Sequence, residues 1–456
     1  MNRASVKQYL IKGGLWAFAG KVAALIVGLA LSSLLARLLS PEDMGAYFLA
    51  FNLATFFSIF SRMGVDNTLQ RFVADAFGNN QPHMACTIIR KGLILTLTSA
   101  FLVAVLVYFW VGPWIAQYLL KSYRLSNSMG FVSVWLVLLT FQYVFTAIFQ
   151  AVKDIRMAVL VNGLLPSAIT TFFIACYLIA KEHATFQQIL PWVLIAGGVN
   201  IMVAFLTLIK EKYKLNAPTK KIKTIGYLKI AGHSWPLLIN TVMMFIMGQS
   251  ALWVISAFRS DAEVAAYGAA VRLVRSTSMA LMAVNMIIPP LIVHFHADKQ
   301  KERLEQVLRS TATIAAVPSL ALLSSYILFG GWILETVYGE YYRAGETVLM
   351  IMSLGQAICV FVGSCGYVLI MTGHNHAIML ISAASSIIAL CGALLLVPQY
   401  GSIGVAIGYT VAMFVHQLTM LVFARYRCGV WTHMGGTYLA TLVLMGRQRI
   451  GGKKLR

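Results

Sequence analysis

Acidic residues are scarce in this chain, and charge of either sign is rare. Its 456 residues include 36 lysines and arginines but only 15 aspartates and glutamates, and charged residues make up 11% of the sequence. Hydrophobic residues make up 59%. A soluble fold of this length cannot bury so much apolar side chain, and apolar runs of 18 or more residues recur along the chain. The composition therefore predicts a polytopic helical membrane protein.

Motifs of enzymes and of metal sites are missing. The six cysteines form no C-x-x-C pair, so we expect neither disulfides nor a metal site. Two histidine pairs, His294/His296 and His374/His376, lie at predicted span ends. Residues two apart on a helix point to different faces, and no carboxylate or thiol completes a ligand set. Without a nucleotide-binding loop, a nucleophile elbow or paired carboxylates, we predict no enzyme, no metal and no cofactor.

Twelve membrane spans are predicted, six in each half of the chain. They divide it into an N-terminal six-helix lobe (1–210), a cytoplasmic basic linker (211–233), a C-terminal six-helix lobe (234–425) and a basic tail (426–456). The apolar patch at 437–445 is too short to cross a bilayer, and we expect it to lie at the interface. The predicted spans are 14–39, 45–61, 91–111, 129–152, 157–180, 189–209, 235–258, 264–288, 311–332, 347–371, 377–397 and 401–424.

The distribution of basic residues predicts the orientation of these spans. With the N-terminus in the cytoplasm, 27 lysines and arginines fall on the cytoplasmic side and six fall on the outer side. Cytoplasmic loops of membrane proteins carry such an excess, so both termini are predicted to be cytoplasmic. The formal net charge of +21 is then a property of the loops, and we expect no nucleic-acid partner.

A weak internal repeat relates the two halves. At an offset of 220 residues, Ser40 aligns with Ser260 and Tyr47 with Tyr267. Each copy holds an even number of spans, so both copies have the same orientation. We therefore predict an all-α integral membrane fold with two lobes related by a pseudo-twofold axis along the membrane normal. A cleft between the lobes would form a central cavity.

Three basic residues lie well inside predicted spans: Lys21, Arg272 and Arg275. A cation at the bilayer centre costs about 2.5–3.5 kcal/mol, so each should face water, a cavity or a partner. All acidic residues fall in loops or at span ends, so we expect no carboxylate within the spans and no internal partner for Arg272 and Arg275. A cavity lined by these cations would bind an anion. Snorkelling of the side chains to the interface remains the alternative.

Polar uncharged residues inside the spans indicate a hydrated interior. In the repeat alignment Asn52 takes the position of Arg272, and Asn240 and Gln249 lie in the predicted seventh span. We predict that these three residues contact the substrate together with Lys21, Arg272 and Arg275. Hydrogen bonding between helices is the alternative role for each of them.

Two stretches resemble those of a known family. The stretch from Leu35 to Tyr47, LARLLSPEDMGAY, resembles the opening of bacterial polysaccharide transporters, the O-antigen flippases. The stretch from Leu396 to Ala406, LVPQYGSIGVA, resembles their Pro-x-Tyr-Gly-x-x-Gly signature. The resemblance covers residues 10–425. It implies membership of the multidrug/oligosaccharidyl-lipid/polysaccharide (MOP) superfamily, with a cationic central cavity and alternating access.

The resemblance also implies a function. Such proteins move an undecaprenyl-pyrophosphate-linked glycan, an O-antigen unit of lipopolysaccharide or a similar one, from the inner to the outer leaflet of the bacterial inner membrane. Expected partners are this glycan lipid, membrane lipids, a glycan polymerase and a chain-length regulator. A multidrug antiporter of the same fold would need a carboxylate facing the cleft. A glycan polymerase or ligase would need a large outer loop with catalytic residues, whereas the longest outer loops, 112–128 and 333–346, are short.

Overall fold

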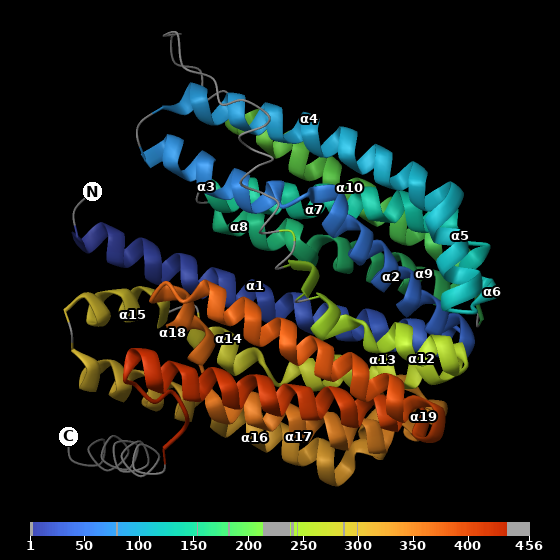
Figure 1. Cartoon of the computed structure of the whole chain (residues 1–456). Helices are drawn as coiled ribbons and strands as arrows, with labels where there is room; N and C mark the ends of the chain where they lie inside the picture. Colours follow the sequence, from blue (N-terminus) through green and yellow to red (C-terminus); the bar gives the residue numbers. More distant parts are fainter. Residues whose placement is uncertain are drawn as a thin grey trace, which may run out of the picture. The chain divides into compact units, whose positions relative to one another are not determined.

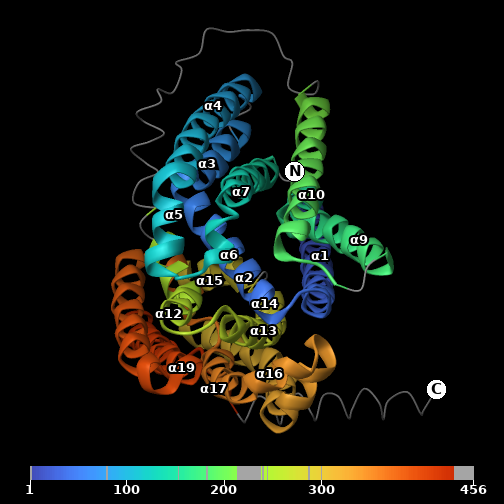
Figure 2. The same ribbon diagram turned by 90° about the vertical axis from the view of Figure 1, so that its right-hand side faces the viewer.

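The computed structural model describes residues 3–78, 81–152, 154–180, 183–212, 238, 241–243, 245–285, 288–298 and 300–435. In this part of the chain all regular structure is helical (Figures 1 and 2). Nine helices in the described ranges are long and apolar enough to cross a membrane, or ten if the bent pair Thr241–Gln249 and Ala251–Phe258 is one span. The protein is thus an all-α, multi-pass membrane protein, as predicted.

The described helices are consistent with the twelve predicted spans. The 54-residue helix α19 (Asn375–Cys428) contains both the eleventh and the twelfth span, and the eighth is divided between α13 (Asp261–Ser276) and α14 (Met279–Asn285). The predicted connection at 62–90 is itself largely helical, because α3 (Val65–Gly78) has one apolar face. That face packs on α4 (Pro82–Leu106) and α7 (Met129–Ala151), as both views show (Figures 1 and 2).

The chain forms two compact units. Unit 1 comprises Met1–Gly268 and Val337–Tyr341, and unit 2 comprises Ala269–Thr336 and Tyr342–Arg456. Unit 1 thus includes α12 (Ala251–Phe258), which belongs to the predicted second lobe. The hydroxyl of Ser33 donates to the carbonyl of Val337, one of the contacts that join the short segment Val337–Tyr341 to unit 1.

Unit 1 is built on α2 (Pro41–Arg62), whose residues are mostly buried. α2 packs along α7, and the core between α3, α4 and α7 is made of side chains such as Leu69, Ile148 and Phe149, which are fully buried. The remaining helices of this unit are α1 (Arg3–Leu38), α5 (Gly112–Trp114), α6 (Tyr123–Ser126), α8 (Ile155–Val159), α9 (Leu165–Ala180) and α10 (Phe186–Lys212).

The internal repeat is visible in the way two helices begin. Ser40 caps α2 by accepting a hydrogen bond from the Asp43 N–H at 3.2 Å. Ser260 accepts one from the Glu263 N–H at 3.4 Å, and α13 begins 220 residues after α2, at Asp261. A serine at this position satisfies one of the free N–H groups of the first turn. The aligned serines therefore cap the beginning of an equivalent helix in both halves.

Unit 2 contains a helical hairpin within α19. Gly401 has φ 56° and ψ −137°, a conformation that favours glycine, and it reverses the chain after Pro398. The two arms then run side by side in opposite directions (Figure 1), with Gly408 against the backbone of Gly392 and Ala393. The family signature at 398–404 is thus the bend of this hairpin. The other helices of unit 2 are α14, α15 (Ile288–Ala297), α16 (Lys301–Tyr338), α17 (Glu346–Val362) and α18 (Cys365–Met371).

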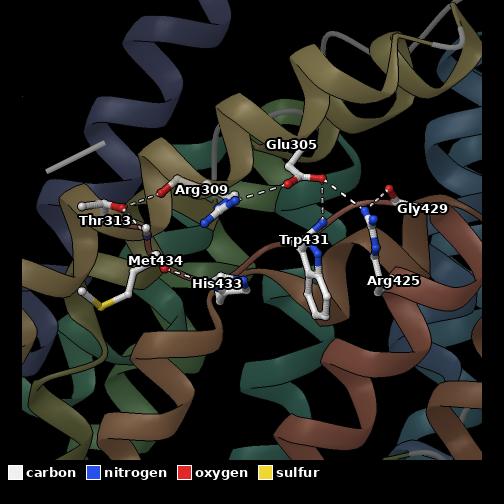
Figure 3. A network of polar contacts seen from close by, with 9 residues as sticks. Glu305, Arg309, Thr313, Arg425, Gly429, Trp431, His433 and Met434 are labelled. Atoms are coloured by element: carbon white, nitrogen blue, oxygen red, sulfur yellow. Dashed lines mark hydrogen bonds and ion pairs between the residues drawn. The ribbon is translucent and has the colours of Figure 1, made fainter. Parts of the chain in front are cut away.

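After α19 the chain turns back and attaches to α16 and α17 (Figure 3). Glu305 of α16 accepts hydrogen bonds or ion pairs from Arg309 at 3.4 Å, from Arg425 at 3.5 Å and from the Trp431 N–H at 3.2 Å. Thr432 donates to the Val362 carbonyl at 2.8 Å. The beginning of the predicted basic tail is therefore part of unit 2, whereas the patch at 437–445 lies outside the described residues.

Candidate functional site

The predicted site residues lie in both units. In unit 1, Lys21 is exposed on α1 and Asn52 is 3% exposed on α2. In unit 2, Arg272 is half-buried and Arg275 is exposed, and both lie in the second half of α13, on one helix face as predicted. Asn240 lies outside the described residues.

The two arginines differ from the prediction in one respect. Both Arg272 and Arg275 make an interaction within the chain, so the prediction that they would lack an internal partner is wrong. The sequence argument counted only carboxylates, and an arginine has five N–H donors that other acceptors and aromatic rings can also engage. Both arginines still lie inside a predicted span.

A break in the predicted seventh span brings two of the candidates together. The helix Thr241–Gln249 and α12 meet at an angle of 50°, and Ser250 lies between them. The side-chain N–H₂ of Asn52 donates to the Gln249 carbonyl at 3.2 Å and to its side-chain oxygen at 3.3 Å. A helix break inside a membrane frees backbone carbonyls that need a partner, and Asn52 supplies one.

Aromatic side chains surround this polar pair one helical turn away. Phe56 follows Asn52 by four residues on α2, and Trp253 follows Gln249 by four residues. The two rings meet edge to face with centroids 4.8 Å apart, and Phe245 lies 5.2 Å from Phe56. Asn52 Oδ1 and Trp253 Nε1 are buried and have no hydrogen-bond partner among the described residues. An acceptor and a donor thus remain available beside an aromatic surface.

A second break, in unit 2, follows the arginines directly. α13 ends at Ser276, and α14 begins at Met279. Three polar side chains from neighbouring helices hold this segment: the Tyr326 hydroxyl lies 2.9 Å from that of Ser276, Ser319 donates to the Thr277 carbonyl at 2.7 Å, and Gln356 donates to Ser278 at 3.0 Å. The position of Arg275, in the last turn of α13, is therefore fixed by a hydrogen-bonded framework.

These two breaks offer complementary chemistry. Amide groups and aromatic faces suit sugars, which present hydroxyl groups on their edges and C–H groups on their faces. Arginine suits phosphate, since its planar guanidinium can donate two parallel hydrogen bonds. Within the described residues no group of three or more His, Cys, Asp or Glu could hold a metal ion.

Several residues of these clusters escaped the sequence analysis. Phe56, Phe245 and Trp253 were not selected because aromatic residues are common in membrane spans, and only the position of the break shows that they meet. His416 was missed as well. It is 7% exposed in the second arm of α19, and its Nε2 lies 3.2 Å from the Ser382 hydroxyl. A single histidine within a span was a signal that the search for pairs overlooked.

The comparison with protein families shows the family to which the chain belongs. The family described as "Polysaccharide biosynthesis protein" matches residues 10–296, which is more than half of the chain. The chain belongs to this family. A second family, described as "MatE", matches residues 236–395, within the second half of the chain. Both matches confirm the family resemblance noted in the two sequence motifs.

Solved structures show that this polysaccharide family member has the MOP superfamily fold. A multidrug resistance MATE family transporter in an inward-facing conformation has a TM-score of 0.70 and 14% identity, over 89% of this chain and 94% of that one. The lipid II flippase MurJ, in an inward closed conformation, has a TM-score of 0.63 and 14% identity, over 90% and 87%. Twelve helices in two lobes with a pseudo-twofold axis are consistent with this fold.

One curated relative matches a shorter region. It is the "Capsular polysaccharide biosynthesis protein CapF" of Staphylococcus aureus, with 22% identity over 143 residues. The match covers 31% of this chain and 36% of that protein, so this chain aligns with about a third of the length of that relative. The relative is named for capsular polysaccharide biosynthesis, and the family for polysaccharide biosynthesis.

Proposed function

We propose that this protein is a flippase that moves an undecaprenyl-pyrophosphate-linked oligosaccharide across the bacterial inner membrane, from the inner to the outer leaflet, by alternating access. The glycan would be an O-antigen unit or a similar surface polysaccharide unit. Arg272 and Arg275 would bind the pyrophosphate, with Lys21 as a further cation. Asn52, Gln249 and Asn240 would contact the sugars, and Trp253 and Phe56 would offer them an aromatic surface.

The observation that carries this proposal is the placement of two arginines, three residues apart, in the last turns of α13 before a helix break. Cations within a predicted span are costly, and broken helices line the substrate sites of many transporters. Membership of the polysaccharide biosynthesis family supports a glycan as the cargo. The fold shared with a lipid II flippase supports a lipid-linked carrier.

The membrane potential would contribute to the outward movement of such an anion. A potential that is negative inside favours outward transfer of negative charge by about 2.3 kcal/mol per charge per 100 mV. With both termini in the cytoplasm, as the basic residues predict, the break that follows Arg275 would lie within the field. A pyrophosphate substrate would therefore gain part of its driving force without a carboxylate inside the spans.

The test is complementation of a strain that lacks this gene. Arg272→Ala and Arg275→Ala should each reduce surface glycan by about tenfold, because each removes one charged hydrogen-bonding partner of phosphate. The lipid-linked intermediate should accumulate in the same cells. Lysine at either position should restore more glycan than alanine does, if charge matters more than guanidinium geometry. Arg90→Ala, which removes an exposed arginine from α4, is the control and should leave surface glycan unchanged.

A second function is favoured by one observation, the TM-score of 0.70 to a multidrug resistance transporter. A cation-coupled drug antiporter would export toxic organic cations, and the deletion strain would then become drug-sensitive with its surface glycan intact. That result, or normal glycan in the double variant Arg272→Ala/Arg275→Ala, would contradict the proposed flippase. Accumulated lipid-linked intermediate together with unchanged drug resistance would exclude the antiporter.

A further inference from the structure

A short turn in unit 1 connects segments from both halves of the sequence. The turn is Leu120–Ser122, and Lys121 has a left-handed backbone conformation with φ 51°. Ser256 of α12 donates to the Leu120 carbonyl at 2.7 Å. The Ser122 hydroxyl donates to Asp261 Oδ2 at 2.6 Å. The turn therefore holds both α12 and the start of α13, at the end of the spans that is predicted to face outward.

The beginning of α2 packs on the same place. A Cβ atom on Gly45 would lie 1.8 Å from the Asp261 carbonyl oxygen, so the two backbones approach as closely as glycine allows. Gly268 makes room in the same way for the ring of Phe48, since a Cβ there would lie 2.4 Å from a ring carbon. We call this contact of α2, the turn and α13 the outer latch. It leaves no room for a larger side chain at Gly45 or Gly268.

The charges at the outer latch are unbalanced. Arg124 of α6 is shared between Glu42, at 3.7 Å, and Asp43, at 3.4 Å, while the carboxylate of Asp261 is bound by a neutral hydroxyl. Desolvation by burial raises the pKa of Asp261, and the charges of Glu42 and Asp43 raise it further. The Ser122 hydrogen bond and the charge of Arg124 act in the opposite direction. The charges that act on Asp261 are those of Glu42 and Asp43 on α2 and of Arg124 on α6. Along the chain, Lys121 is next to Ser122, and Arg259 and Glu263 are each two residues from Asp261. Tyr341 is influenced by Glu42 and Glu263.

These contacts set the sign that a pH dependence of the outer latch would have. When the latch opens, Asp261 gains water and its pKa falls back toward the ordinary aspartate value. Protons then bind the closed form more tightly than the open form, so acid favours closure and a rise in pH favours opening. The contact with Ser122 survives protonation, because a carboxylic acid can donate to the same hydroxyl oxygen.

We propose that Asp261 is a proton-binding site that holds the outer latch closed when the solution on that side is acidic. The proton comes from that side and returns to it, so the site biases the conformation without carrying protons across the membrane. This inference rests on the proposed flippase function, in which an outer gate must open to release the glycan and close again for the return. Acidity outside the membrane would speed the closing step.

The experiment measures the latch directly, by the distance between two spin labels in the full-length protein in lipid vesicles. The labels are attached at Asn127→Cys, beside α6, and Phe258→Cys, at the end of α12, both of which are exposed. The three cysteines that are not buried, Cys86, Cys176 and Cys391, are replaced by serine, and the buried ones remain. The ratio of short to long distances should fall as the pH is raised from 5 to 8.

Two variants locate the proton. Asp261→Asn, which cannot ionise, should keep the short distance at every pH. Glu263→Gln is the matched control, because it removes a carboxylate two residues away on the same helix, and it should titrate like the parent protein. A ratio that is constant with pH in the parent protein would overturn the proposal, even if Asp261→Asn failed to fold. Loss of the pH response in Glu263→Gln, or its persistence in Asp261→Asn, would overturn it as well.

This measurement is independent of the glycan. If the distances respond to pH as expected while the deletion strain shows normal surface glycan, the flippase assignment fails and the proton site stands. If glycan is lost in the deletion strain but the distances do not change with pH, the proton site fails and the flippase assignment stands. The two proposals can thus fail separately.

Discussion

Two acidic residues organise polar clusters at different places in the chain, and their surroundings are opposite. Glu305 in unit 2 faces two arginines, Arg309 and Arg425, and a backbone N–H (Figure 3). Asp261 in unit 1 faces two other acids, Glu42 and Asp43, which share one arginine, and its own partner is a serine.

The difference separates a cluster in which opposite charges meet from one in which like charges crowd. Each contact of the Glu305 carboxylate joins it to a cation or to an N–H donor, so these contacts all favour attachment of the returning segment 429–435 to α16. Asp261, by contrast, is repelled by the neighbouring carboxylates, and protonation removes this repulsion. An acidic residue thus attaches one segment of the fold, and another acidic residue makes a different segment sensitive to pH.

The largest effect is expected from a steric change that disrupts the outer latch and leaves the Glu305 cluster intact. Gly45→Ala places a methyl group on the Asp261 carbonyl oxygen, and overpacking of this kind costs about 3 kcal/mol. We expect the closed outer latch to be lost at every pH in the spin-label measurement, while thermal unfolding of unit 2 is unaffected. Gly28→Ala on α1 is the control, because no atom lies within 4 Å of its Cβ position. A closed latch in Gly45→Ala would show that the contact is looser than the structure indicates.

The next effect is the loss of the Glu305 cluster. Glu305→Gln removes both ion pairs and weakens the acceptor for Trp431, and we expect a loss of about 2 kcal/mol of stability. The segment 429–435 should then become accessible to protease at a lower temperature than in the parent protein. Glu302→Gln, which is exposed on the same helix, should change neither the cleavage temperature nor the pattern. Equal cleavage of the two variants would rule out Glu305 as the anchor.

The smallest effect is expected from removal of Arg124, whose charge acts on Asp261. Arg124 lowers the pKa of Asp261, so Arg124→Gln should raise the pH at which half of the latch opens. The shift should be small, because the arginine side chain is 44% exposed and solvent screens its charge. High salt should reduce the difference between the variant and the parent protein. A shift to lower pH would contradict the charge balance described for the outer latch.

The sequence allowed the spans and the repeat to be predicted, because both depend on local patterns. Apolar runs fix the membrane segments, and Ser40 and Ser260 mark equivalent helix starts wherever the helices lie. The Pro-x-Tyr-Gly-x-x-Gly stretch was identified only as a family signature. Its structural role, a reversal at Gly401, depends on a backbone conformation that no composition argument shows.

Contacts between residues far apart in the chain could not be predicted from the sequence. Asn52 and Gln249 were both selected for polarity, but nothing in the sequence joined them, since 197 residues separate them. Ser122 was not selected at all, because a lone serine in a loop carries no signal until Asp261 is found beside it. Counting carboxylates also left out the uncharged acceptors and rings that can engage an arginine such as Arg272.

The segment 429–435 has a consequence for how the protein is made. It is synthesised after every described helix of unit 2, yet it contributes hydrogen bonds to α16 and α17, through Glu305, Thr313, Phe361 and Val362. Unit 2 therefore cannot complete its packing while its last helix is still leaving the ribosome. Until then Glu305 has only the arginine of its own helix, Arg309, as a partner among these contacts, and the attachment of α16 and α17 to the end of the chain is the last part of unit 2 to form.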